Sequence, residues 1–409
     1  MIYMVTGGLG FIGSNYVRYL IETDQSARIV VLDALTYAGN LFNLEGYLSD
    51  ENVIYPQMHK ELLPVVINSS GQLADSIPNV KTKIERIKRK LKGFRLLLTD
   101  TRKVCTYVEK VFSGSSSMGL SPSRLAVVIG NIIDHYIVSE LMSLSDIVVN
   151  FAAETHVDRS ILNPNEFIKT DVYGTYVLLN AARKCPNLKK FVHISTDEVY
   201  GVATEKSFTE TDPINPRNPY SASKAAADRL VYAYNQTYGL PVNIVRPSNN
   251  FGPYQYPEKL IPVMIIKALR NEPLPVYGDG KQIRDWLYVE DTVKAIQLVV
   301  NKAEPGEVYN IAGRNERENI EVVRRILQKL GKPKSLIKHV QDRPGHDRRY
   351  SLDDSKIRTE LGFTQEGTFE EKLDYTIQWY LDNQKWWQRI IDEDKEYREF
   401  MDKWYASRS

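Results

Sequence analysis

The most constraining feature of the chain is a glycine-rich turn close to its first residue. Ile2–Val5 is a short apolar segment typical of a strand, the run TGGLGFIGS follows it, and helical spacing begins directly afterwards. Gly7, Gly10 and Gly13 form the pattern GxxGxxG. Glycine at these positions permits a tight turn and brings the backbone close to a pyrophosphate, which the helix N-terminus attracts. We therefore expect a βαβ unit that binds a dinucleotide.

Asp33 indicates which dinucleotide is bound. It ends the second expected strand, Arg28–Leu32, twenty residues beyond Gly13. A carboxylate at this place accepts hydrogen bonds from the ribose hydroxyls of NAD and repels the 2′-phosphate of NADP. The next residues, Ala34 and Leu35, are not basic. The pattern predicts NAD as the cofactor.

Apolar β-branched segments alternate with helical patterns along most of the chain. The remaining strands are expected at residues 125–129, 146–150, 190–195 and 242–246, and helices at 170–184 and 221–238. This alternation predicts an α/β fold with a doubly wound parallel sheet. We expect a Rossmann-type NAD domain at 1–246 and a smaller C-terminal substrate-binding lobe at 247–409.

One insertion interrupts this alternation at about residues 56–123. Its stretch Lys81–Lys110 contains eleven Lys or Arg against three Asp or Glu, and a Ser/Gly-rich run follows. We expect an inserted helical segment with a linker, whose charge run is a solvated face rather than a nucleic-acid or membrane contact. The aromatic helical tail, about 369–405, is expected to pack or to form a dimer contact.

Composition excludes several classes of protein. The 409 residues carry 53 basic and 51 acidic side chains, which argues against a nucleic-acid binder. No apolar run reaches the roughly 18 residues of a membrane span, and a motif at residue 6 leaves no place for a cleaved leader. Cys105, Cys185 and the six histidines lack metal-ligand spacing. We expect a cytoplasmic protein without a metal, and without membrane or nucleic-acid partners.

Tyr220 and Lys224 form the pattern YxxxK at the start of an expected helix. A spacing of four places both side chains on one helix face. An ammonium group near a phenol lowers the phenol pKa, which is ordinarily about 10. Tyr220 would then accept a hydroxyl proton while a hydride leaves the same carbon.

Three polar residues follow the expected strand at 190–195, namely Thr196, Asp197 and Glu198. Ligands of doubly wound sheets bind beyond the carboxyl ends of the strands, where these residues must lie. Adjacent carboxylates after a buried strand are costly unless they are used or solvated. A helix-capping acidic turn is the alternative interpretation.

The chain resembles the extended short-chain dehydrogenases/reductases, and within them the nucleoside-diphosphate-glucose 4,6-dehydratases. The motifs that carry the resemblance are TGGLGFIGS, LDALTYAGNL, FAAETHVDRSI, FVHISTDEVYG, NPYSASKAAADRLV, SNNFGPYQYPEKLIP, VYGDGKQIRDWLYVEDT, YNIAGRNERENIEVV and DRPGHDRRYSLD. They cover residues 1–54 and about 125–390 in the order of the family. The resemblance implies conversion of dTDP-glucose to dTDP-4-keto-6-deoxyglucose and water, by NAD-mediated hydride transfer from C4 to C6, in deoxysugar synthesis.

The same resemblance assigns catalytic roles. Tyr220, assisted by Lys224, is the expected base for the 4-hydroxyl, and Thr196 is expected to bond to O4. Glu198 is expected to remove the C5 proton, and Asp197 to protonate the departing 6-hydroxyl. Such an elimination needs one ionised and one protonated carboxyl, and neighbouring carboxyls can divide the two states between them.

Binding residues are also implied by the resemblance, together with a homodimer. The expected cofactor residues are Gly7, Gly10, Phe11, Ile12, Gly13, Asp33, Ala34, Leu35, Thr36, Asn131, Ile132, Phe151, Ala152, Ala153, Thr170, Tyr220, Lys224 and Asn250. The expected substrate residues are Thr155, Asn249, Lys259, Leu260, Pro275, Val276, Tyr277, Arg284, Asn319 and the segment from Asp342 to His346. The family usually has an acidic residue at the position of Asn131, whose amide oxygen still accepts from the adenine amine but carries no charge.

Two other functions remain open at this point. A UDP-glucose 4,6-dehydratase or a UDP-sugar decarboxylase would keep the fold and change the base or the sugar. A non-catalytic, NAD-bound scaffold would use the basic insertion to hold a partner.

Overall fold

The computed structural model of the chain describes residues 1–48, 52–57, 96–115 and 121–406. The chain forms two compact units. Met1–Ala152 with Tyr173–Phe191 make the first, and Ala153–Val172 with Val192–Ser409 make the second. These units are defined by packing. The predicted division at residue 246 concerns function instead, because it separates residues that bind the cofactor from residues that bind the substrate, and it remains a prediction.

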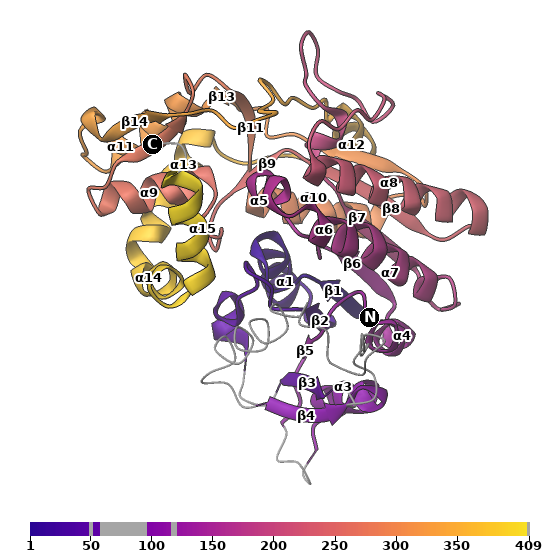
Figure 1. Cartoon of the computed structure of the whole chain (residues 1–409). Helices are drawn as coiled ribbons and strands as arrows, with labels where there is room; N and C mark the ends of the chain where they lie inside the picture. Colours follow the sequence, from indigo (N-terminus) through magenta and orange to yellow (C-terminus); the bar gives the residue numbers. More distant parts are fainter. Residues whose placement is uncertain (49–51, 58–95, 116–120, 407–409) are drawn as a thin grey trace, which may run out of the picture. The chain divides into compact units, whose positions relative to one another are not determined.

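The first unit is built on a parallel sheet in the order β6–β1–β2–β5–β3–β4 (Figure 1). Its strands are β1 (Ile2–Thr6), β2 (Arg28–Asp33), β3 (Val53–Gln57), β4 (Leu96–Asp100), β5 (Leu125–Ile129) and β6 (Ile147–Asn150). Its helices are α1 (Phe11–Thr23), η1 (Leu41–Tyr47), η3 (Thr101–Lys103), α3 (Val104–Ser113), α4 (His135–Leu144) and α7 (Thr175–Ala182). Every residue of β5 and β6 is buried, as in strands covered on both faces. The predicted α/β fold with a parallel sheet is confirmed.

The described end of the insertion contains a strand as well as a helix. β4 pairs with β3 in parallel and extends the sheet, and helix α3 follows it. The sequence interpretation expected only helix and linker here, because three leucines followed by a threonine and an aspartate, after a long basic stretch, give a weak strand signal. Residues 81–95 of the basic stretch, and 116 and 117 of the Ser/Gly-rich run, lie outside the described residues.

The second unit contains strands in the order β12–β8–β7, of which β8 and β12 pair in parallel. The strands are β7 (Lys190–Ile194, whose first two residues belong to the first unit), β8 (Val242–Pro247) and β12 (Val308–Ile311). The helices before β12 are α5 (Val157–Leu162), α6 (Pro164–Phe167), η6 (Asp197–Tyr200), α8 (Pro219–Tyr238), α9 (Leu260–Leu269) and α10 (Val289–Lys302). The predicted helix at 170–184 is a π-helix, η5 (Ile168–Gly174), followed by α7.

Two small sheets complete the second unit. β13–β11–β9 is mixed, and β10–β14 is parallel. Their strands are β9 (Asn249–Phe251), β10 (Leu274–Tyr277), β11 (Ile283–Tyr288), β13 (Glu316–Glu318) and β14 (Ile337–Val340). The last helices are α11 (Asn319–Lys329), η7 (Lys334–Leu336), α12 (Ser355–Leu361), α13 (Phe369–Asp382), α14 (Gln384–Glu393) and α15 (Lys395–Ala406). Residues of α9, α11, α13 and α14 share one hydrophobic core. Within the described ranges, no helix is long and apolar enough to cross a membrane.

A buried ion pair joins α8 to β8 inside the second unit. Arg246 donates from Nε to Asp228 Oδ2 at 2.8 Å, and their side chains are 2% and 0% exposed. Arg246 also donates from Nη1 to the Tyr200 hydroxyl at 2.6 Å, and that hydroxyl donates to Asn310 at 2.8 Å. Removal of either partner destabilises the folded protein, because the remaining charge stays buried without a counter-charge.

Replacing Arg246 with Met should therefore lower the free energy of unfolding by about 3–5 kcal/mol, measured by urea denaturation. The matched control is Arg270→Met, which removes an exposed ion pair to Glu272 and should cost less than about 1 kcal/mol. Equal effects of the two substitutions would contradict the role given to the buried pair.

Candidate active site

The glycine-rich turn after β1 and the first turn of α1 leave no space for a Cβ at Gly7 and Gly13. Gly7 has a φ of +67°, and a Cβ there would lie 2.7 Å from the backbone nitrogen of Ala152. A Cβ on Gly13 would collide with the carbonyl oxygen of Gly7. α1 begins at Phe11, directly after Gly10. The backbone can thus approach an anion at the positive end of a helix, which fits the pyrophosphate of a dinucleotide.

Asp33 is held by the backbone at the end of β2. Its Oδ2 accepts from the Leu9 amide at 2.9 Å and its Oδ1 from the Leu35 amide at 2.8 Å. The residue is 7% exposed. Each carboxylate oxygen has two lone pairs, so the group keeps capacity for ribose hydroxyls while its orientation is fixed. The predicted residues Ala34 and Thr36 lie in the same loop.

The other predicted cofactor residues of the first unit follow neighbouring parallel strands. Asn131 and Ile132 come just after β5, and Phe151 and Ala152 come directly after β6. Together with the turn after β1 and Asp33, they lie at the carboxyl edge of one sheet, as the switch-point rule predicts. Asn131 Oδ1 accepts from the Ile133 amide at 3.1 Å, so this oxygen also orders its own turn.

Two adjacent carboxyl groups follow β7 in the second unit. Thr196 caps η6: its Oγ1 accepts from the Glu198 amide at 3.3 Å and donates to Asp197 Oδ1 at 3.0 Å. Asp197 is 3% exposed, and its Oδ2 has no hydrogen-bond partner among the described residues. Burial and the neighbouring Glu198 raise the pKa of Asp197 to about 8. The carboxyl group of Asp197 therefore carries a proton more often than not at neutral pH.

Lys224 connects α8 to the end of β7. Its Nζ donates to the carbonyl oxygen of Ile194 at 2.6 Å, and the residue is 3% exposed. Asn218 and Ser221 form a capping box at the start of α8, which orders the turn that carries Tyr220. The predicted proximity of the phenol, the lysine and the carboxyl pair is thus built from one helix start and one strand end.

The pKa of Tyr220 differs from the sequence-based expectation. It is raised well above its ordinary value by burial and by the negative carboxyl groups of Glu198, Asp171 and Asp197, and a hydrogen bond with Thr196 opposes the shift. The expectation of a lowered pKa was wrong because it counted only the lysine. Burial and the three neighbouring carboxyl groups together raise the pKa of the phenol in this structure, and the lysine does not reverse that rise.

Asp171 is a buried carboxyl group that sequence reasoning missed. It lies in the π-helix η5 and is 1% exposed. Its Oδ1 accepts from the Glu154 amide at 2.8 Å and its Oδ2 from Ser223 Oγ at 2.6 Å. Burial raises its pKa to about 6, while the ammonium of Lys224 lowers it. A single aspartate in a helical pattern resembles a surface residue, so the sequence offered no signal.

The buried Arg284 and the half-buried Arg343 both lie close to Glu198. Arg284, on β11, is 5% exposed, donates to the Asp347 carbonyl oxygen at 3.0 Å and lies 4.2 Å from the ring centroid of Tyr350. Arg343, within the predicted segment 342–346, pairs with Asp158 at 3.0 Å. Its Nε has no hydrogen-bond partner among the described residues. Sequence reasoning missed Asp158 and Tyr350, whose hydroxyl lies 3.4 Å from Glu198 Oε2.

The remaining predicted substrate residues differ in the surroundings of their side chains. Some present polar atoms: Asn249 Oδ1 and Asn319 Oδ1 are buried without partners in the described part of the chain, and His346 Nδ1 lies 2.6 Å from Asp342 Oδ1. Val276, by contrast, is 1% exposed and belongs to the hydrophobic core, so its side chain serves packing. The structure places the others as follows: Thr155 before α5, Lys259 and Leu260 at the start of α9, and Pro275 and Tyr277 on β10.

The last predicted cofactor residues also lie in the second unit. Ala153 begins it, and Thr170 is in η5. Asn250, on β9, donates from Nδ2 to the Ser248 carbonyl oxygen at 2.9 Å and accepts from Thr292 at 2.5 Å. No group of three or more potential ligands that could hold a metal occurs among the described residues.

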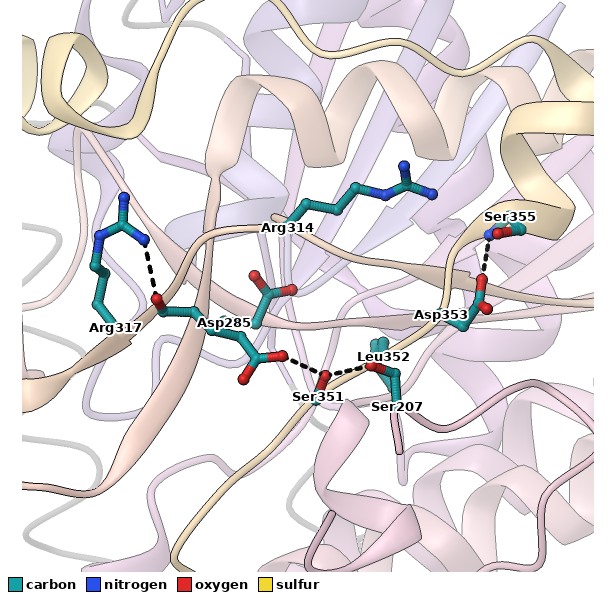
Figure 2. Close-up of a pocket in the computed structure, with 9 residues that line it drawn as sticks. Ser207, Asp285, Arg314, Arg317, Ser351, Leu352, Asp353 and Ser355 are labelled. Carbon is teal, nitrogen blue, oxygen red and sulfur yellow. Dashed lines mark hydrogen bonds between the residues drawn. The ribbon is translucent and has the colours of Figure 1, made fainter. Parts of the chain in front are cut away.

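A pocket of about 510 Å³ in the second unit is separate from these residues (Figure 2). It is lined by Ser207, Asp285, Arg314, Glu316, Arg317, Ser351, Leu352, Asp353 and Ser355. Ser351 donates to Glu316 at 2.6 Å, and Arg314 pairs with Asp354 at 2.7 Å. These internal pairs satisfy the polar lining, and the pocket contains no predicted catalytic or binding residue.

Comparison with known proteins identifies the class of protein. The family described as GDP-mannose 4,6 dehydratase matches residues 91–376, and the family described as NAD dependent epimerase/dehydratase matches residues 3–119. The chain belongs to these extended short-chain dehydrogenases/reductases, among the nucleotide-sugar dehydratases.

Particular relatives narrow the class. A dTDP-glucose 4,6-dehydratase of Xanthomonas campestris pv. campestris is 42% identical over 95% of this chain and 96% of the relative. The Escherichia coli dTDP-glucose 4,6-dehydratase is 41% identical over 96% of this chain and 97% of the relative. The crystal structure of DesIV, a dTDP-glucose 4,6-dehydratase from Streptomyces venezuelae with NAD and TYD bound, is similar with a TM-score of 0.75 and 36% identity, over 95% of this chain and 100% of that chain.

The raised pKa of Asp197 predicts a stability that falls with pH. In the unfolded chain this group titrates near pH 4, whereas in the folded chain its pKa is about 8. Its contribution is complete below about pH 4 and is lost as the pH rises toward 8, because the folded state keeps a proton that the unfolded chain releases. The substitution Asp197→Asn should therefore raise the melting temperature relative to wild type more at pH 8 than at pH 5, measured by calorimetry.

A control of opposite sign is available at Asp24. A hydrogen bond from Ser26 is the largest influence on its pKa, which is lowered, so Asp24→Asn should destabilise more at neutral pH than at pH 3. A difference between Asp197→Asn and wild type that does not change with pH would contradict the account of Asp197.

The close packing around Gly13 generates a second prediction. Gly13→Ala should weaken dinucleotide affinity by more than about tenfold, because the new methyl group displaces the Gly7 carbonyl. Gly46→Ala is the matched control, since a Cβ at Gly46 meets nothing within 4 Å. Calorimetric titration measures the NAD affinity of both variants. An unchanged affinity in Gly13→Ala would contradict the role given to the glycine-rich turn.

Proposed function

We propose that this chain is a dTDP-glucose 4,6-dehydratase, which converts dTDP-glucose to dTDP-4-keto-6-deoxyglucose and water for deoxysugar synthesis. The observation that carries the proposal is the pair of adjacent carboxyl groups of Asp197 and Glu198 at the end of β7, next to Tyr220, with the pKa of Asp197 raised to about 8. An elimination needs one carboxyl that donates a proton and one that accepts one. The identity to dTDP-glucose 4,6-dehydratases over most of the chain supports the same reaction.

NAD is the proposed cofactor, and the residues present fit it. The glycine turn after β1 would hold its pyrophosphate and Asp33 its ribose, where the carboxylate excludes a 2′-phosphate. NAD supplies a hydride acceptor for C4 of the sugar and, once reduced, the hydride donor for C6. The remaining proposed cofactor contacts are Phe11, Ile12, Ala34, Leu35, Thr36, Asn131, Ile132, Phe151, Ala152, Ala153, Thr170, Tyr220, Lys224 and Asn250.

The chain's own side chains would move the protons. Tyr220 takes the proton of the 4-hydroxyl, and Thr196 donates a hydrogen bond to O4. The 4-ketone then acidifies the C5 proton, which Glu198 removes. Asp197 protonates the 6-hydroxyl as the C6–O bond breaks, so water leaves. Glu198 would return its proton to C5 when C6 receives the hydride. The proton taken by Tyr220 replaces the one given by Asp197, so protons and charge balance.

The substrate's diphosphate would bind at a group of cations in the second unit. Glu198 influences the pKa values of Arg284, Arg343 and Lys259, so these cations lie near it, and Arg343 Nε lacks a partner in the described structure. An anionic ligand would satisfy charge-assisted hydrogen bonds from these groups. We therefore assign residues 1–246 chiefly to the cofactor and 247–409 chiefly to the nucleotide sugar, the latter through the substrate residues predicted from the sequence.

A cytoplasmic homodimer completes the proposal. Leu162, Ile168 and Tyr232 expose 50%, 53% and 42% of their surface, and the helices α5 and α6 of this region pack on α8. A second copy of the chain would cover such apolar side chains. Cys105 and Cys185 are free thiols, as expected in a reducing compartment.

The decisive experiment follows a deuterium label. Incubation of the purified protein with dTDP-glucose deuterated at C4 should yield a 4-keto product with deuterium in the new methyl group, detected by mass spectrometry and NMR. Parallel incubation with UDP-glucose tests the base, and turnover of the uridine compound alone would overturn the thymidine assignment. Glu198→Gln should lower the rate by about 10²-fold or more while NAD remains bound; undiminished turnover would remove Glu198 from the mechanism.

A further inference from the structure

The C-terminal helix α15 turns an aromatic face toward the segments that carry the substrate residues. Tyr397, Phe400 and Trp404 are spaced i, i+3 and i+7 and so lie on one side of the helix. Tyr397 and Trp404 are 7% and 4% exposed, whereas Arg398 and Glu399 face the solvent. Figure 1 shows α15 in yellow beside α14.

A chain of hydrogen bonds runs from this face to a guanidinium group of the substrate site. Trp404 donates from Nε1 to the hydroxyl of Tyr277 at 2.6 Å. That hydroxyl donates to Asp158 Oδ2 at 3.0 Å, and Asp158 Oδ1 accepts from Arg343 Nη1 at 3.0 Å. The position of α15 thus bears on the position of Arg343.

Phe400 makes a second connection, to the segment before α5. Its ring meets that of His156 edge-on at 5.5 Å, and the guanidinium of Arg159 lies 4.2 Å from its centroid. His156 has a φ of +86°, a strained conformation that the surrounding packing must maintain. Arg159 in turn pairs with Glu258 at 2.9 Å, directly before Lys259.

The aromatic face of α15 lies outside the largest hydrophobic cluster described for this unit. The core shared by α9, α11, α13 and α14 contains no residue of α15. Besides packing on α14, the aromatic face contacts the segments 156–159 and 256–257 and Tyr277.

We propose that α15 positions Arg343 and the segment of Lys259 for the diphosphate of a nucleoside-diphosphate substrate, with Trp404 as the positioning residue. The helix acts through Tyr277 and Asp158 and need not touch the substrate. This inference rests on the proposed function, because it takes Lys259, Arg284 and Arg343 as the diphosphate site. It gives the C-terminal tail a part in substrate binding, beyond the packing expected from its sequence.

The test uses Trp404→Phe in the full-length holoenzyme, which keeps a ring and removes the donor to Tyr277. We expect the dissociation constant of dTDP, measured by calorimetry, and the KM for dTDP-glucose each to rise about fivefold. The kcat should stay within about twofold and the melting temperature should hardly change. Glu399→Ala, on the solvent face of α15, is the matched control and should leave every value unchanged.

Tyr277→Phe, alone and combined with Trp404→Phe, closes a double-mutant cycle. If the two residues act through one chain of hydrogen bonds, their effects on dTDP binding are not additive. Additive effects, or an unchanged dissociation constant in Trp404→Phe, would overturn the proposal, as would a fall in kcat with an unchanged KM. Should Trp404→Phe fail to fold, Phe400→Leu tests the same face, with weaker dTDP binding as the expected result and unchanged binding as the contrary one.

Binding and turnover separate this inference from the proposed function. A wild-type protein that binds dTDP but does not dehydrate dTDP-glucose would refute the function, and the binding cycle would still decide the role of α15. A wild-type protein that binds none of dTDP, UDP and GDP would overturn the inference itself.

Discussion

The hydrogen bond from Lys224 Nζ to the carbonyl oxygen of Ile194 joins the two elements on which the proposed chemistry depends. Lys224 lies one helical turn beyond Tyr220 on α8, and Ile194 ends β7 two residues before Thr196. Burying an ammonium group costs free energy unless the group is paired and hydrogen-bonded. Loss of the bond to Ile194 would therefore be destabilising. It therefore fixes the phenol relative to the carboxyl pair more firmly than either backbone would alone.

The same constraint creates an electrostatic conflict. Asp171, Asp197 and Glu198 surround Tyr220, and as anions they oppose the formation of a phenolate. Burial moderates the conflict, because it raises the pKa of Asp197 to about 8 and leaves that carboxyl neutral at pH 7. Burial raises the pKa of Asp171 to about 6, and the nearby ammonium of Lys224 opposes that rise. The property that makes Asp197 a proton donor thus also limits the negative field on the phenol.

How much of this could be predicted from the sequence differs from element to element. The first βαβ unit, Asp33 and the residues after β7 were predicted because apolar runs mark parallel strands, and the carboxyl ends of such strands share one edge. The strand β4 was not expected, because a short apolar run beside many charges has no clear period. Asp171 was not expected either, because its burial depends on Ser223 and on the Glu154 amide, which are distant in sequence.

The cations of the proposed diphosphate site show why sequence patterns stop short of a complete site. Lys259, Arg284 and Arg343 come from separate segments, and each is a long side chain with considerable conformational entropy to lose. Arg284 is ordered by a strand and by the Asp347 carbonyl oxygen. Arg343 has a carboxylate partner in α5 and, through Tyr277, a connection to Trp404 near the C-terminus. Preorganisation of such a site is a property of contacts between distant segments, so a motif can identify the cation but not the residues that hold it in place.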